Sequence, residues 1–185
     1  MPGFNPRHEP EGIMFNIITF TLIHVVLSLV GIFAGLVVVG GLVAGKRLDG
    51  WTGIFLVTTV LTNVTGFGFP FVTFLPSHGV GILSLLVLPF VFYARYGKQL
   101  AGSWRRVYVV GAVLTLYLNV FVLIVQLFRR LPALIAAAPT QKESPFVVTQ
   151  LLVLALFVWL GREAFKRFHT DTLTSPRVAT LPAQG

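Results

Sequence analysis

Long stretches without charge are the feature that most constrains how this chain can fold. No Asp, Glu, Lys or Arg occurs in residues 12–45, 50–94, 107–128 or 144–161. A helix crosses the hydrocarbon core of a bilayer with about 20 apolar residues. The second stretch is long enough for two crossings and each of the others for one. The sequence therefore predicts an all-α, polytopic transmembrane bundle of five spans.

The composition agrees with this prediction. Charged residues make up 11% of the 185 residues, and hydrophobic residues make up 55%, whereas soluble domains carry about 25% charged residues. The net charge of +8 comes from residues between the predicted spans, where cations orient a protein and contact anionic lipids, so nucleic-acid binding is not expected. The chain has no Cys, which excludes disulfides, thiolate metal sites and iron–sulfur clusters.

Glycine, proline and charged residues set the predicted boundaries. The Gly/Pro-rich residues 66–70 are expected to end the second span, and Pro89 to kink the third. Residues 129–143 are expected to hold a short interfacial helix, and Ser144 to cap the fifth span. If the linker 66–78 does not reach the far side of the membrane, the count falls to four. The predicted segments are a flexible tail 1–12, spans 13–44, 52–69, 80–96, 107–128 and 145–161, and a basic, then disordered tail 162–185.

The distribution of cations predicts the orientation. With the N-terminus outside, ten of the fourteen Lys and Arg residues fall on the cytoplasmic side, which is the side where positive charge is retained. Trp51, Trp104 and Trp159 all fall on the same predicted boundary, where amphipathic rings anchor a span. We therefore expect the N-terminus outside and the C-terminus in the cytoplasm.

The first span carries a stripe of small and polar residues around His24. Because they are spaced by three and four residues, one helix face carries Thr21, His24, Ser28, Gly31 and Gly35. An ionisable residue at depth is costly and is a functional candidate, so His24 either bonds across a helix seam or has a ligand or proton role. The packing residues predicted for this span are Ser28, Gly31, Gly35, Gly41 and Gly45.

The second and fourth spans carry hydroxyl and amide side chains that can form a polar sector. Threonine often bonds to the carbonyls of its own helix, but the amide of Asn63 has two donors and an acceptor to satisfy. The sector is either interhelical glue or the lining of a cavity. Its predicted residues are Thr58, Thr59, Thr62, Asn63, Thr115, Asn119 and Gln126.

Histidines offer one redox hypothesis. His24 and His78 could serve as axial ligands of a haem b, or His78 with residues 67–74 could bind a quinone; no cofactor is predicted outright. No Asp or Glu lies inside a predicted span, and the sequence has no phosphate-binding loop, metal-ligand cluster or triad. We therefore expect no catalytic residues, no metal site and no enzyme activity.

One segment carries a resemblance. Residues 45–71, GKRLDGWTGIFLVTTVLTNVTGFGFPF, resemble a segment of uncharacterised small multi-pass bacterial inner-membrane proteins. The similarity extends over most of the membrane region. It implies a bacterial inner membrane, and it brings no activity, cofactor or catalytic residue with it.

Three functions follow as expectations. The first is a non-catalytic scaffold or accessory subunit, whose glycine stripes pack against a second copy or a partner membrane protein. The second is a haem- or quinone-binding redox module that uses His24 and His78. The third is a small solute channel or carrier lined by the polar sector of the second span.

Overall fold

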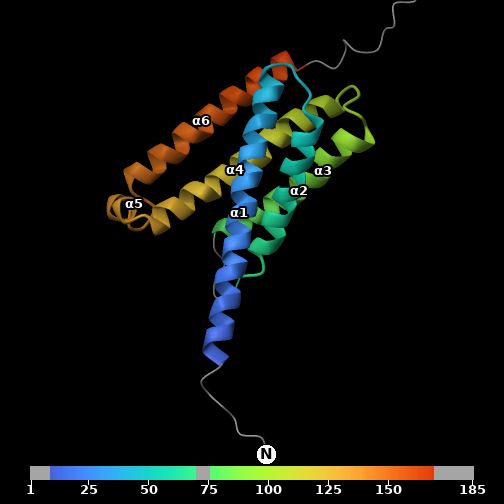
Figure 1. Ribbon diagram of the computed structural model, residues 1–185. Coiled ribbons are helices and arrows are strands. Elements are labelled where there is room, and N and C mark those ends of the chain that lie inside the picture. The colour runs from blue at the N-terminus through green and yellow to red at the C-terminus, as the bar shows by residue number, and fades with distance from the viewer. Residues whose placement is uncertain (1–8, 70–75, 169–185) are drawn as a thin grey trace, which may run out of the picture.

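A computed structural model describes residues 9–69 and 76–168, and these residues form helices joined by turns, with no strand among them. This confirms the all-α expectation. Figure 1 shows the arrangement. The elements are α1 Glu9–Val43, α2 Asp49–Gly66, α3 Pro76–Phe92, the π-helix η1 Tyr93–Gly97, α4 Trp104–Arg130, α5 Pro132–Ala137 and α6 Ser144–Arg167.

The long helices run alternately in opposite directions (Figure 1). The first four form a ring, because α1 contacts α2 and α4, and α3 contacts the same two helices from the other side. Helix α6 packs on the outside of this ring against α1 and α4. The short α5 follows α4 directly, where residues 129–143 were predicted to hold an interfacial helix.

Four helical segments of the described residues are long and apolar enough to cross a membrane: Asn16–Val43, His78–Gly97, Trp104–Arg130 and Ser144–Arg167. The chain therefore has the character of a multi-pass membrane protein. Helix α2 does not join this group, because its 18 residues include five threonines and Asn63. The structure thus gives four apolar segments where the sequence predicted five spans.

The charged residues gather at the two ends of the bundle. Contacts between the turn after α1, η1, the start of α4 and the end of α6 bring nine cations to one end, which we call the basic end. The opposite end, called the far end, holds the last residues of α2, the first residues of α3, and α5. Among the described residues, the cations are Lys46, Arg47, Arg95, Lys98, Arg105, Arg106, Arg162, Lys166 and Arg167 at the basic end, and Arg129, Arg130 and Lys142 at the far end.

The half of the bundle nearest the basic end has a largely apolar core. Phe55, Leu56, Leu88, Val91 and Leu116 are all buried to within 1% of complete. They come from α2, α3 and α4, so one cluster joins three helices. This half is closely packed in the way expected of a protein interior.

Helix α3 ends in a π-helical turn. The N–H of Lys98 donates to the carbonyl of Tyr93 at 2.8 Å, which is the five-residue spacing of a π-helix. Gln99 and Leu100 follow with left-handed φ values of 50° and 64°. The side chain of Leu100 is nevertheless buried, so the turn inserts it into the core.

Several boundaries differ from the predicted ones. Helix α1 already begins at Glu9, and α6 continues to Arg167, so residues 9–12 and 162–167 are helical. Ser144 is the first residue of α6, and the cap position belongs to Glu143. The remaining tail residues and most of the 67–74 region lie outside the described residues or at their edge.

The loop before α6 is organised by the Glu143 carboxylate. It accepts hydrogen bonds from the N–H and the hydroxyl of Thr140, at 3.2 and 2.8 Å, and from the N–H of Lys142 at 3.1 Å. The bond from the Thr140 hydroxyl lowers the pKa of the Glu143 carboxyl below its ordinary value. Because this side chain turns back into the loop, it does not cap the helix that follows it.

Candidate functional site

Helix α2 is the hub of the polar contacts in the bundle. Its hydroxyl and amide side chains form hydrogen bonds to three other helices, at successive depths from the basic end to the far end. The bonds are Thr52 Oγ1 with Tyr108 Oη at 3.0 Å, Asn119 Nδ2 to Thr59 Oγ1 at 3.2 Å, Asn63 Nδ2 to Ser84 Oγ at 3.1 Å, and His24 Nδ1 with Thr65 Oγ1 at 2.9 Å.

His24 lies on the seam between α1 and α2. The Thr65 hydroxyl has one proton and donates it to the carbonyl of Leu61 at 2.7 Å, so the arrangement that satisfies both groups has the His24 Nδ1–H donating to Thr65 Oγ1. The ring also packs edge-on against Phe69, with centroids 5.2 Å apart. Ser28 Oγ donates to the His24 carbonyl at 2.7 Å. The imidazole of His24 therefore links α1 to α2.

His78 lies at the same end of α2 but against a different ring. It is buried, and its imidazole stacks on Phe67 with centroids 6.1 Å apart and an interplanar angle of 25°. The two histidines that the sequence proposed as ligands thus both lie beside the last residues of α2 and the turn that follows it. Each imidazole is packed against its own phenylalanine.

The amides of the predicted polar sector bond within the chain. Asn63 Nδ2 donates to the Thr59 carbonyl at 2.8 Å and to Ser84. Asn119 Nδ2 reaches the hydroxyl of Thr59, which is fully buried. Thr58 donates to the Ile54 carbonyl at 2.7 Å. The bonds with Ser84 and Asn119 connect α2 to α3 and α4, and the bonds to the Thr59 and Ile54 carbonyls lie within α2.

The remaining sector residues are not gathered into the same network. The hydroxyls of Thr62 and Thr115 are buried without a hydrogen-bond partner among the described residues. Gln126 is half-buried on α4. The Oε1 of Gln150 on α6 is likewise buried and unbonded, although its Nε2 donates to the Phe121 carbonyl at 3.3 Å. Unbonded buried oxygens of this kind are places where water or a ligand group can bond.

The glycines predicted for helix packing are used inside this chain. A Cβ on Gly31 would lie 3.1 Å from a threonine hydroxyl of α2, and one on Gly35 would lie 2.6 Å from Leu116 Cδ1. A Cβ on Gly41 would lie 2.7 Å from Leu48 Cδ1. Gly45 has a left-handed φ of +69° and lies in the turn after α1. The surfaces expected to receive a partner are therefore already occupied at Gly31, Gly35 and Gly41.

Sequence reasoning missed a charged cluster at the basic end. Asp49 Oδ1 accepts a hydrogen bond from Arg47 Nε at 2.9 Å and a second one from the guanidinium of Arg95. The Arg95 side chain is only 3% exposed, and its Nε has no hydrogen-bond partner among the described residues. The sequence does carry a signal for the burial of Arg95. Leu88, Val91 and Arg95 are spaced by three and four residues, which places all three on one buried helix face.

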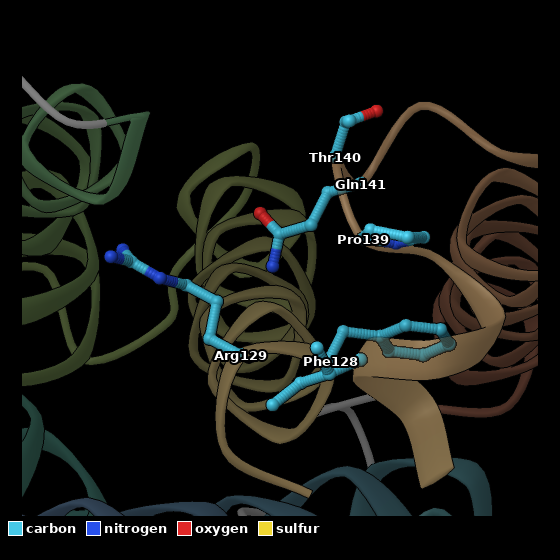
Figure 2. Close-up of a pocket in the computed structure, with 6 residues that line it drawn as sticks. Phe128, Arg129, Pro139, Thr140 and Gln141 are labelled. Atoms are coloured by element: carbon cyan, nitrogen blue, oxygen red, sulfur yellow. The ribbon is translucent and has the colours of Figure 1, made fainter. Parts of the chain in front are cut away.

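The far end carries an open cavity of about 250 Å³ between the end of α4 and the loop after α5 (Figure 2). Gln141 shapes it, with a left-handed φ of 59° and an Nε2 that donates to the Val125 carbonyl at 3.1 Å. None of the predicted site residues lines it. The lining residues are Phe128, Arg129, Ile135, Pro139, Thr140 and Gln141.

Two further observations bear on the chemistry. Within residues 9–69 and 76–168, no three His, Asp or Glu side chains are grouped so that they could hold a metal ion. Comparison with protein-family models, with curated proteins and with solved structures finds no match to this chain. The function must therefore be argued from the geometry itself.

Proposed function

We propose that this chain is a non-catalytic membrane subunit, a scaffold or accessory protein whose work is to hold a rigid helical surface in the bilayer. One observation carries the proposal: the imidazole of His24 and the amides of Asn63 and Asn119 are each bonded to another helix of the same chain. Groups committed to a neighbouring helix stabilise the bundle and are not poised to act on a substrate.

We also propose a five-span topology with the N-terminus outside, in a bacterial inner membrane. The place of α2 in the ring between α1 and α3 supports five spans, as does its length, because its 18 residues extend for about 27 Å, close to the thickness of a hydrocarbon core. The concentration of cations at the basic end supports placing that end in the cytoplasm. The bacterial assignment rests on the resemblance of residues 45–71.

Gentle purification from a bacterial membrane tests the function. We expect a colourless protein whose mass spectrum shows lipid, a second copy or another polypeptide. A chromophore or quinone present in stoichiometric amount would contradict the proposal. Single His24→Leu and His78→Leu variants are the matched controls, since a seam role for His24 predicts reduced stability without the loss of any bound molecule.

A haem- or quinone-binding module is the second candidate. It is favoured by the position of both His24 and His78 at the far end of α2, against the rings of Phe69 and Phe67. Titration with haem b, followed by the Soret band, tests this candidate. Saturable binding that both histidine variants abolish would support it, and binding that neither variant changes would reject it.

A small solute channel or carrier is the third candidate. A water-filled path through the bundle needs polar groups that can bond to water or solute. The groups that favour it are the hydroxyls of Thr62 and Thr115, which have no hydrogen-bond partner among the described residues, and the half-buried Gln126. Solute flux into proteoliposomes is the measurement. Flux that Thr115→Val reduces would support a path, and flux equal to that of empty liposomes would reject it.

A further inference from the structure

The cavity at the far end lies at the depth where lipid headgroups begin. The apolar segment Trp104–Arg130 is long enough to cross a membrane, and the cavity opens beside its last residues. Figure 2 shows the rings of Phe128 and Pro139 on one side, and Gln141 and Arg129 on the other. A cavity with one apolar and one polar side, at the boundary between hydrocarbon and water, suits an amphiphile.

The walls of this cavity are held in place by packing and by one hydrogen bond. Phe128 is buried, and its ring meets the ring of Phe146 edge-on with centroids 5.3 Å apart, which joins α4 to α6. Ala138 is buried in the same apolar cluster. Gln141 keeps a left-handed φ, which is costly for a residue with a side chain, and its bond to the Val125 carbonyl anchors it to α4. The cavity is therefore a built part of the fold.

The cations beside the cavity have no anionic partner in the described part of the chain. Residues 129–143 hold three cations and one carboxylate, that of Glu143. This carboxylate accepts hydrogen bonds from N–H and hydroxyl groups of its own loop. The ion pairs between described residues all lie at the basic end. The three cations are Arg129, Arg130 and Lys142.

The position of these cations is not explained by topology. Most cations of the described residues gather at the basic end, where the retention of positive charge accounts for them, and the same rule disfavours cations at the opposite end. The dipole of α4 attracts Arg129 and Arg130 in its last turn. It acts on both alike and does not extend to Lys142, which lies in the loop before α6. An anion bound at the cavity would neutralise this charge.

We propose that the cavity binds the headgroup of an anionic phospholipid that carries hydroxyl groups, as phosphatidylglycerol does. A guanidinium can bind two phosphate oxygens at once, and Arg129 is the cation that lines the cavity. The Gln141 Oε1 and the Thr140 hydroxyl oxygen accept no bond from a described residue, so both can accept bonds from the glycerol hydroxyls. The acyl chain then continues along Phe128 and Ile135.

Other ligands of similar chemistry fit less well. Phosphatidylcholine has no headgroup hydroxyl, and its ammonium group would face the guanidinium. Inorganic phosphate shares the anion but leaves the apolar side of the cavity uncovered. The inference goes beyond the proposed scaffold function and does not depend on it, because a lipid can bind to this cavity whatever the bundle itself does.

Photo-crosslinking of the full chain in phosphatidylcholine nanodiscs tests the site. The probe is a fixed, small amount of phosphatidylglycerol with a diazirine near the glycerol end of one acyl chain, and mass spectrometry locates the adducts. We expect adducts concentrated on residues 128–141, and excess unlabelled phosphatidylglycerol should reduce them several-fold. The same excess of phosphatidylcholine, or inorganic phosphate in the buffer, should leave them unchanged.

Three variants locate the binding group. Arg129→Gln should reduce the far-end adducts several-fold. Arg130→Gln is the matched control, since it removes the adjacent exposed arginine of the same helix turn, which does not line the cavity, and its adducts should match those of the unchanged chain. Ile135→Trp fills the apolar side without changing the charge and should also reduce the adducts. Adducts at the basic end are the internal reference for folding in every variant.

Several outcomes would overturn the proposal. Equal reductions by the two arginine variants would show that only local charge matters. Adducts spread evenly along the bundle, or displaced equally by phosphatidylcholine, would show unselective contact with lipid. Displacement by inorganic phosphate would assign the cavity to a free anion. None of these results depends on a chromophore or a partner polypeptide, so the lipid site can fail while the scaffold function stands, and the reverse.

Discussion

The two halves of the bundle are held together by different means. Near the basic end, apolar side chains such as Phe55 and Leu116 are completely buried, and the Asp49–Arg95 pair joins the first residue of α2 to η1. Toward the far end, Asn63, Asn119 and His24 are only half-buried and bond one helix to the next in pairs. The first half is a packed core, whereas in the second the contacts of α2 are separate polar links, beside a smaller apolar cluster of Ile124, Phe128 and Ala138.

This difference indicates where the molecule tolerates change. Close packing makes a core sensitive to the loss of a few methyl groups, while hydrogen bonds between membrane helices contribute modestly. The far half is also where α1 departs from the other helices, and where buried oxygens such as Thr62 Oγ1 have no hydrogen-bond partner within residues 9–69 and 76–168. Partner binding or rearrangement is therefore expected in the far half.

The largest effect is expected from Leu116→Ala in the packed core. Leu116 is fully buried against the Gly35 position of α1, so the truncation should lower the free energy of unfolding by about 2–5 kcal/mol. Unfolding in mixed micelles measures it. Leu123→Ala, on the half-buried part of α4, is the matched control, and an equal loss there would contradict the proposed difference between the halves.

Asp49→Asn should have the next largest effect. It removes the partner of a buried guanidinium, but Asp49 itself is 61% exposed, so we expect a loss of about 1–3 kcal/mol in the free energy of unfolding. Arg47→Gln, which removes an exposed cation beside the same carboxylate, should cost about 0–1 kcal/mol. Adding Arg95→Met to Asp49→Asn should recover stability; if it does not, the pair is not the source of the loss.

Asn119→Ala should have a smaller effect, of about 0.6–1.7 kcal/mol, because it breaks one hydrogen bond between membrane helices. The Asn119–Thr59 bond can be isolated by a double-mutant cycle with Thr59→Val, measured by the same unfolding assay. Additive losses from the two variants would show that the bond contributes nothing. A loss larger than that of Leu116→Ala would reverse the comparison of the halves.

The smallest effect on stability is expected from Glu143, in the loop before α6 at the far end of the bundle. The hydrogen bond from Thr140 lowers its pKa in the folded chain, so its contribution to stability is present above the ordinary pKa and is lost as the pH falls through the folded one. Glu143→Gln should remove this pH dependence. Melting temperatures compared across the acidic range measure it, and identical profiles for the two proteins would count against the loop network.

Much of the fold was predictable because bilayer thickness fixes helix lengths. The uncharged runs located α1, α3, α4 and α6, and the glycines after Asn63 located the end of α2. The helix ends were less predictable, since they depend on local bonds such as that between Glu143 and Thr140. The π-helix has no signal in hydropathy at all, because it changes the hydrogen-bond spacing and not the composition.

The candidate site was predictable as a set of residues but not as a set of pairs. Asn63 and Asn119 were identified by the cost of burying an amide, yet their partners Ser84 and Thr59 depend on how the helices are rotated. Arg95 lies at the end of an apolar run, where an arginine usually reaches water. Its spacing from Leu88 and Val91 indicates the buried face, but its contact with Asp49 depends on the path of η1, which only the three-dimensional structure shows.

The π-helix has a consequence for insertions and deletions. A π-helical turn holds one more residue than an α-helical turn, so a chain one residue shorter in η1 would rotate the residues after the deletion by about 100° around the helix axis. Deleting one residue there would make a continuous α-helix and rotate Arg95 relative to Val91. Loops usually tolerate insertions and deletions. Although η1 leads into a loop, we expect its number of residues to be fixed as strictly as that of the core.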